Sequence, residues 1–542
     1  MTTDQATYAR RWYILGAACF ALFMAILDNL VVNIALPTIS RDLEATTTQL
    51  QWIVSVYTLV FAALQITAGG LGDRFGRKRW FMIGTAMFTV TSLVAAFSVN
   101  IEMLIAMRAL QGVGAALIMP LSLSLISDAF PPEERGRALG VWSAVSISGL
   151  AAGPIVGGAL VEYGDWNWVF LINVPIGIIA LIVSWFVVRE SRDTSGEAST
   201  DVLGTVLVTA CIGTLTWGLI EAGDRGWTDT LILAALFGSL GLGAAFVWVE
   251  AHVQRPMVPL RFFASRTFAG ANIVSFSISF AIIAFAFFWT LYLQNIHGFS
   301  AVKTGMSLLP LVAVMMVCSP ISGALINRIG ASRQLALGTL ISAAGMLLFL
   351  RGDVDASYID IMPALVVLGF GNSLIFAPMT TAVLNSVDSS KSGVASAING
   401  AVREVGSAFS IAFLGTIMNQ VYQSRYNSSE AIRELRADPA LGPIQPLLDL
   451  VGTGVGLAGR VAQDTSVFPG FTADVAARVR EASSVAFMAG MDRGIIIGAL
   501  AMVLSSALAF WLVDDRVVRG ETAVRTVEAG GSDAAAAVQA GD

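Results

Sequence analysis

The sequence predicts an all-α polytopic membrane protein, because charge is scarce and the uncharged apolar blocks are long. Of the 542 residues, 13% are charged and 56% are hydrophobic, whereas soluble domains carry about 25% charged residues. The block 268–293 contains no Asp, Glu, Lys or Arg and exceeds the roughly 18 residues that indicate a membrane span. So few charges cannot cover the surface of a soluble chain of this length, which excludes a water-soluble multidomain enzyme.

Apolar runs predict fourteen transmembrane (TM) helices. Their approximate limits are 13–36, 52–72, 80–99, 103–126, 138–161, 168–188, 202–220, 230–249, 268–293, 305–326, 335–350, 361–384, 395–420 and 494–513. An even number of spans places both termini on one side of the membrane.

Basic residues predict which side that is. Short loops on the side of the termini hold Arg10, Arg11, Arg74, Arg77, Lys78, Arg79, Arg135, Arg137, Arg189, Arg192, Arg255, Arg261, Arg266, Arg328, Arg333, Lys391, Arg516, Arg519 and Arg525. Those on the other side hold Arg41, Arg225, Lys303 and Arg351. Because Lys and Arg are enriched in cytoplasmic loops, both termini are expected in the cytoplasm.

One connection is long and polar. Residues 421–493 contain four prolines, and 429–436 and 473–485 look locally helical and amphipathic. We expect an extracytoplasmic linker with short surface helices; a ligand-binding lid is the alternative. The Gly- and Ala-rich end of the tail 516–542 is expected to be disordered.

Several activities have no support in the sequence. A net charge of −6 gives no basic surface for nucleic acid. No phosphate-binding loop, zinc-protease motif, CxxC pair or suitable GxSxG turn occurs. We therefore expect no enzyme activity, catalytic residue, metal or cofactor.

The segment 69–79 is the most informative motif and reads GGLGDRFGRKR. Its glycines suit a tight turn and close helix approach, and its acid adjoins a basic cluster. A loop shaped by charge asymmetry alone would need the arginines only. The residues singled out are Gly69, Asp73, Arg74, Gly76, Arg77 and Lys78.

This segment is similar, residue by residue, to the G-x-L-x-D-R-x-G-R-K-x signature of the major facilitator superfamily. The segment 104–114 (LIAMRALQGVG) resembles its arginine-bearing motif, and 149–158 (GLAAGPIVGG) resembles its antiporter motif. The segment 27–37 (LDNLVVNIALP) is similar to the pattern of the fourteen-helix drug:proton antiporters, with Asn29 at the usual Thr position. The resemblance extends over about residues 10–515.

The resemblance implies two six-helix bundles with two inserted helices. The expected units are an N-terminal bundle 1–190, an inserted pair 191–260, a C-terminal bundle 261–515 and a cytoplasmic tail 516–542. The segment 323–330 echoes 69–76, with Asn327 at the position of Asp73, as two related bundles require. Transporters with such repeats bind substrate between the halves.

Four charged residues remain well inside the predicted spans: Asp28, Arg108, Arg403 and Glu404. Each costs about 2.5–3.5 kcal/mol or more near the bilayer centre, so function is the default interpretation. The resemblance implies that Asp28 and Arg108 are neighbours in a cavity, where burial and the arginine act in opposite directions on proton binding. The alternative is that Arg108 only neutralises a buried acid.

Glu404 is the second candidate proton carrier. A simple pair with Arg403 is the alternative, although adjacent helical residues point in different directions.

Two further roles follow from the resemblance. Asp73, Arg77 and Asp128 would latch the halves in the outward-facing state. The antiporter motif would thin and bend its helix into a seal against proton leak, with ordinary helix packing as the alternative. Its residues are Gly149, Gly153, Pro154, Gly157 and Gly158.

Spans nine and ten are rich in aromatic residues and methionine. We expect most of these to face lipid and a minority to line an apolar pocket. They are Phe276, Phe280, Phe285, Phe287, Phe288, Trp289, Tyr292, Met306, Met315 and Met316.

The resemblance thus implies a proton-coupled multidrug efflux antiporter that exports hydrophobic, cationic toxic compounds and confers antibiotic resistance. Its expected partners are those small molecules, protons and the lipid bilayer, and we expect a multi-pass monomer in a bacterial plasma membrane. An exporter of one endogenous metabolite (an antibiotic, siderophore or lipid) remains open. So does a membrane receptor or assembly factor on a transporter fold, although the intact antiporter motifs argue against it.

Overall fold

A computed structural model describes residues 3–43, 45, 47–192, 201–253, 256, 258–388, 391–452 and 472–518. The helices of the first half are α1 (Thr3–Asp42), α2 (Thr47–Phe75), α3 (Arg77–Ala96), α4 (Ile101–Ala129), α5 (Pro132–Tyr163), α6 (Asn167–Leu171) and α7 (Asn173–Val187). Next come α8 (Val202–Arg225) and α9 (Thr230–His252). The second half contains α10 (Arg266–Leu291), α11 (Ala301–Ser307), α12 (Leu309–Ile329), α13 (Ala331–Phe349), α14 (Tyr358–Asn385), α15 (Ser392–Ser428), α16 (Glu430–Ala437), α17 (Gln445–Gly452), α19 (Ala473–Leu512) and α20 (Asp515–Val518).

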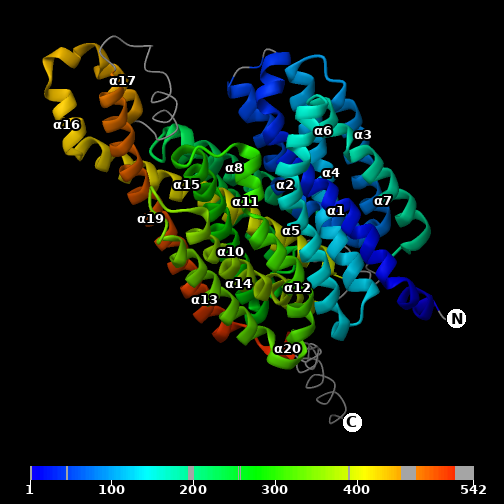
Figure 1. The fold of residues 1–542 in the computed structure, drawn as a ribbon. Coiled ribbons are helices and arrows are strands. Elements are labelled where there is room, and N and C mark those ends of the chain that lie inside the picture. The colour runs from blue at the N-terminus through cyan, green and yellow to red at the C-terminus, as the bar shows by residue number, and fades with distance from the viewer. Residues whose placement is uncertain are drawn as a thin grey trace, which may run out of the picture.

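All fourteen predicted spans fall on helices. Within the described part of the chain, thirteen helical stretches are long and apolar enough to cross a membrane. The predicted span 138–161 is not among them, but it lies on α5, which is 32 residues long and packs along α1 and α12. The start of α1 and the short helix α20 lie toward one end of the bundle, and α16 and α17 lie at the other (Figure 1). We call these the tail end and the cap end.

The helices form two groups that contact each other through a few pairs. In the first group α2, α3 and α4 pack together and α1 packs on α5 and α7; in the second, α13, α14 and α19 pack together and α10 packs on α15. The groups meet where α2 contacts α15 and where α5 contacts α12, while α8 touches both α2 and α15 (Figure 1).

Two glycines build equivalent turns in the two groups. Gly76 precedes α3 with φ 116°, and Gly330 precedes α13 with φ 91°. Both angles lie in the left-handed region that favours glycine. The sequence echo of 69–76 in 323–330 therefore corresponds to the same helix–turn–helix geometry.

The predicted linker over 421–493 is wrong at both ends. Helix α15 continues to Ser428, and α19 already begins at Ala473. The polar sequence at these two ends is therefore compatible with continued helix. The rings of Tyr422 and Tyr426 stack at 5.8 Å, and the Tyr422 hydroxyl donates to the Val451 carbonyl of α17 at 2.9 Å.

The amphipathic segments predicted at 429–436 and 473–485 fall on α16 and the start of α19. Residues 453–471, which include Pro469, and the tail from Arg519 onward lie outside the described residues.

The prediction that most aromatic and Met residues of spans nine and ten face lipid is also wrong. Helix α10 is central in its group because it packs against α14, α15 and α19. Buried side chains are Phe280, Phe285, Phe288, Trp289, Tyr292 and Met315. Met306 and Met316 are exposed, as expected.

Candidate functional site

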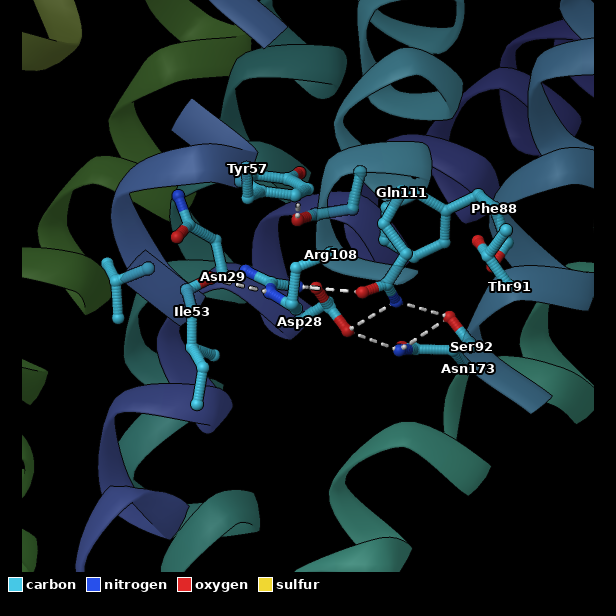
Figure 2. A network of polar contacts seen from close by, with 12 residues as sticks. Asp28, Asn29, Ile53, Tyr57, Phe88, Thr91, Ser92, Arg108, Gln111 and Asn173 are labelled. Atoms are coloured by element: carbon cyan, nitrogen blue, oxygen red, sulfur yellow. Dashed lines mark hydrogen bonds and ion pairs between the residues drawn. The ribbon is translucent and has the colours of Figure 1, made fainter. Parts of the chain in front are cut away.

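A buried ion pair lies within the first group of helices. The Arg108 guanidinium of α4 donates to the Asp28 carboxylate of α1, and both side chains are 0% exposed (Figure 2). The predicted neighbours therefore form a direct pair.

Two further amides hold Asp28. Asn173 Nδ2, at the start of α7, donates to Asp28 Oδ1 at 2.6 Å, and Gln111 Nε2 donates to the same oxygen at 3.3 Å (Figure 2). Both amides also donate to the Ser92 hydroxyl of α3, at 3.3 and 2.6 Å. Residues of α1, α4 and α7 thus meet at one carboxylate, and Ser92 of α3 joins the two amides.

Arg108 has its own set of partners. Its Nε donates to the Ile53 carbonyl at 3.1 Å, and its Nη1 also donates to Gln111 Oε1 at 2.9 Å. The guanidinium lies 4.3 Å from the centre of the Tyr57 ring, a cation–π distance. Its Nη2 has no hydrogen-bond partner among the described residues.

Both carboxylate oxygens of Asp28 are paired or hydrogen-bonded. A buried carboxylate is costly unless it is paired and hydrogen-bonded, and Arg108 together with two amides supplies the donors. Adding a proton to Asp28 would remove its charge and leave Arg108 without a counter-ion in a buried site. Protonation of one atom would therefore destabilise the contacts among four helices.

Sequence reasoning missed Ser92, Gln111 and Asn173. Gln111 had a usable signal, because it follows Arg108 by three residues and shares its helix face. Ser92 and Asn173 had none, since small polar residues are common in membrane helices and only packing brings these two together.

Arg403 and Glu404 lie on α15 and do not pair with each other. The Arg403 guanidinium is 5.7 Å from the centre of the Phe376 ring of α14, and its Nε has no hydrogen-bond partner among the described residues. Within the same part of the chain, Glu404 forms no ion pair or hydrogen bond, although its side chain is half-buried. Tyr57 of α2 is within electrostatic reach of both Asp28 and Glu404, and α15, which carries Glu404, packs against α2.

The motif acid Asp73 joins the two groups at the tail end. Its two oxygens accept the backbone N–H groups of Gly393 at 3.1 Å and Val394 at 2.9 Å, at the start of α15. A carboxylate is favoured at a helix N-terminus. Arg77, which is 2% exposed, donates its Nε to Asp73 at 2.9 Å. The predicted latch residues Asp73 and Arg77 are therefore in contact.

The other members of the motif surround this contact less tightly. Asp128 is 3.7 Å from Arg77 and 43% exposed, so this pair is weak. Lys78 Nζ donates to the Trp185 carbonyl at 2.8 Å, and Arg74 lies over the Phe75 ring at 4.5 Å.

The structure shows a second requirement for glycine at position 76, which the sequence does not reveal. The Glu190 carboxylate accepts the N–H groups of Lys78 and Arg79 at 3.1 Å each, and so caps α3. A Cβ on Gly76 would lie 2.6 Å from Glu190 Oε1, closer than real contacts allow.

The antiporter motif packs against the α1 segment that carries Asp28. A Cβ on Gly153 would lie 2.6 Å from the Leu30 Cβ, and one on Gly149 would lie 3.0 Å from Ile26. Gly157 faces Val31 in the same way, and Gly158 faces Val302 of α11. The side chain of Pro154 lies outside the described residues. Gly149, Gly153 and Gly157 let α5 approach α1 closely on both sides of Asp28.

The two groups are joined by two closely packed helix–helix interfaces, which we call the α2–α15 seam and the α5–α12 seam. In the α2–α15 seam, Gly69 lies against Gly393; a Cβ there would also lie 2.7 Å from the Ala397 Cβ. In the α5–α12 seam, Gly140 lies against Ser319, and Asn327 Nδ2 donates to the Glu133 carbonyl at 3.0 Å. Glycine at such positions permits backbone-to-backbone approach.

Gln65 is an unpaired amide in the α2–α15 seam. It is 1% exposed, it lies against Gly400, and neither of its polar atoms has a hydrogen-bond partner among the described residues. Gly400 and Glu404 share one face of α15, since they are four residues apart.

An apolar pocket of about 260 Å³ lies where α8 and α9 meet the two groups. Its lining includes Ile66 of α2, Ile212 of α8, Phe246 of α9, Phe276 of α10 and Val402 of α15. Phe276, a member of the predicted aromatic set, thus lines a pocket. In the described part of the chain, no group of three or more His, Cys, Asp or Glu residues could hold a metal ion.

Two helical groups with related turns, a charged motif at their junction and a buried ion pair define a multi-pass membrane protein of the transporter type. The chain belongs to the major facilitator superfamily, whose family model matches residues 18–411.

Comparisons with other proteins support this assignment. The chain is 36% identical over 409 residues to the tetracenomycin C resistance and export protein of Streptomyces glaucescens, covering 76% of each chain. It is 31% identical to the multidrug efflux pump LfrA of Mycolicibacterium smegmatis, covering 93% of this chain and 96% of that one. Among solved structures, the proton:xylose symporter XylE shares the fold with a TM-score of 0.60 at 13% identity, over 95% of this chain and 98% of that one.

Proposed function

We propose that the protein is a proton-coupled exporter of hydrophobic, cationic toxic compounds, working by alternating access. The observation that carries this proposal is the buried pair of Asp28 and Arg108 with its amide donors. Relatives named for drug and antibiotic export support the export of small molecules. The protein is then a transporter, without enzymatic activity or cofactor.

Proton binding at Asp28 is the proposed coupling step. It breaks the ion pair, frees Arg108, and loosens the contact between α1 and α4 (Figure 2). One proton supplies about 1.4 kcal/mol per pH unit and about 2.3 kcal/mol per 100 mV, enough to drive a substantial outward gradient.

Glu404 is the proposed site for a cationic substrate, because it is half-buried and forms no ion pair or hydrogen bond with another described residue. Arg403, at the adjacent position, would contribute a positive charge near this site. The apolar pocket beside α8 and α9 would receive the hydrophobic part of a substrate that enters from the bilayer.

We further propose a bacterial plasma membrane location, with the tail end and both termini in the cytoplasm. The chain would act as a monomer built from residues 1–190, 191–260 and 261–515, followed by the tail 516–542. Asp73, Arg77 and Asp128 would then latch the cytoplasmic side of an outward-facing state, and the α5 glycines would seal α1 against proton leak.

A second candidate is the export of one endogenous compound. The relative from Streptomyces glaucescens, named for export of a single antibiotic, favours it. Saturable transport of one compound, with no transport of unrelated cations, would establish this alternative.

The test is ethidium uptake into proteoliposomes with an imposed pH gradient. Uptake by inside-out molecules should follow the gradient and stop when a protonophore removes it. Absence of gradient-driven transport for a panel of cations would refute the multidrug proposal. Transport of the same cations without any proton flux would refute the coupling.

A further inference from the structure

A second pocket, of about 560 Å³, opens at the tail end of the C-terminal group. It lies where the starts of α10 and α13 meet the turn from α19 into α20. Three arginines from these separate elements line it: Arg266, Arg333 and Arg516. We call it the arginine pocket.

None of the three guanidinium groups is paired with an acid of the described residues. All three side chains are exposed, and none forms an ion pair or a side-chain hydrogen bond with another described residue. Three positive charges from distant parts of the sequence therefore converge on one pocket, and no described side chain accepts a hydrogen bond from them.

The two carboxylates in the same pocket are held by backbone groups. Asp515 Oδ1 accepts the N–H of Ser332 at 2.8 Å, at the start of α13, and Asp514 Oδ1 accepts the N–H of Arg516 at 2.9 Å. The backbone N–H of Asp514 donates to the Thr267 hydroxyl at 3.0 Å. These acids fix α20 in place and leave the pocket with a net positive charge.

Aromatic side chains place this pocket at the edge of the apolar layer. Phe510 and Trp511, the last aromatic residues of α19, also line it and are 63% and 75% exposed. Tryptophan concentrates at the level of lipid headgroups. The pocket thus presents arginines at headgroup depth, beside rings that suit contact with lipid chains.

We propose that the arginine pocket binds the phosphate group of an anionic phospholipid. Guanidinium groups bind phosphate oxygens through paired, charge-assisted hydrogen bonds, and basic pockets between membrane helices are suited to anionic headgroups. The proposal is independent of what the protein transports.

The bound headgroup also acts on the contact between the two groups. The Val518 carbonyl of α20 accepts Asn385 Nδ2 at 2.7 Å, and Asn385 Oδ1 accepts Arg135 Nη1 of α5 at 2.8 Å. Arg516 and Val518 belong to the same single turn. A lipid that holds Arg516 therefore supports a hydrogen-bonded chain that reaches the N-terminal group.

The test is lipid retention by the purified full-length protein in native mass spectrometry, with a thermal-shift assay in parallel. The probes are phosphatidylglycerol, phosphatidylcholine and inorganic phosphate. Wild type should retain phosphatidylglycerol over phosphatidylcholine and unfold at a higher temperature with it. Each of Arg266→Gln, Arg333→Gln and Arg516→Gln should weaken retention about fivefold, and the triple variant about a hundredfold.

Arg192→Gln is the matched control, because Arg192 is an exposed tail-end arginine of the other half that does not line the pocket; it should bind as wild type does. Arg516→Gln, on a short exposed turn, serves alone if the triple variant does not fold. Equal retention by wild type and Arg516→Gln would overturn the proposal. Stabilisation by inorganic phosphate equal to that by phosphatidylglycerol would overturn the assignment to a lipid.

Discussion

The two halves hold their membrane-embedded carboxylates in opposite ways. Asp28 in the N-terminal group is fully buried and accepts hydrogen bonds from Arg108, Gln111 and Asn173. Glu404 in the C-terminal group is half-buried and has no described hydrogen bond or ion pair. A satisfied carboxylate is suited to switching between two packed states, whereas an unsatisfied one is available to a ligand. Under the proposed function, this difference assigns coupling to Asp28 and substrate binding to Glu404.

Asp28→Asn is the change with the largest expected effect. The amide keeps the shape of Asp28 but leaves Arg108 buried without its counter-ion, which costs about 3–5 kcal/mol. Proton-driven ethidium transport in proteoliposomes should fall more than a hundredfold. Asp28→Glu retains the charge and should retain measurable transport. Wild-type transport by Asp28→Asn would contradict the coupling role.

The charged residues of this site could be predicted from the sequence, but their second partners could not. A charge in an apolar run is conspicuous at any position, so Asp28, Arg108, Arg403 and Glu404 are all recognisable. Asn173 comes from a helix far along the chain, and nothing in its local sequence distinguishes it from an ordinary polar residue.

The helix limits, too, could be predicted only in part from the sequence. Apolar runs located every predicted span on a helix, because burial in lipid requires apolarity. They failed at the ends of 421–493, since α15 and α19 continue as helices through polar sequence, where tertiary contacts such as Tyr422 to Val451 hold them.

Asp73→Asn should have the next largest effect. Its comparison with Asn327→Ala tests the charged α2–α15 seam against the neutral α5–α12 seam. Asp73 holds the start of α15 and pairs with Arg77, whereas its counterpart Asn327 makes one exposed, neutral hydrogen bond to Glu133. Losing the charged acceptor should cost the closed tail end about 1.5–3 kcal/mol, against about 0.5–1.5 kcal/mol for Asn327→Ala.

Spin labels at Arg192→Cys and Arg328→Cys would report the distance between the two helical groups at the tail end. Both residues are exposed, and they lie in opposite halves. The distance distribution should shift toward the separated state much more in Asp73→Asn than in Asn327→Ala. Equal shifts would show that the charge adds nothing to the seam.

Glu404→Gln should alter substrate choice with little loss of stability, because no described partner is left unpaired. Transport of a monovalent cation should fall about tenfold, the loss of one charge-assisted contact, while transport of a neutral hydrophobic compound should persist. The thermal unfolding temperature should match wild type. A parallel loss of neutral and cationic substrates would instead assign Glu404 to coupling, like Asp28.

Gln65→Leu should have the smallest effect, and of opposite sign on stability. Gln65 is buried against Gly400 with both polar atoms unpaired, and an unsatisfied buried amide is unfavourable. Leucine has a similar volume and no polar group, so it should stabilise the closed α2–α15 seam by about 1 kcal/mol. Since alternating access requires this seam to open, a higher unfolding temperature should accompany slower ethidium transport.

Thr67→Val is the control, because Thr67 pairs with Thr209 of α8 at 2.9 Å rather than with α15. A lower unfolding temperature in Gln65→Leu would mean that the amide is satisfied in the closed state after all.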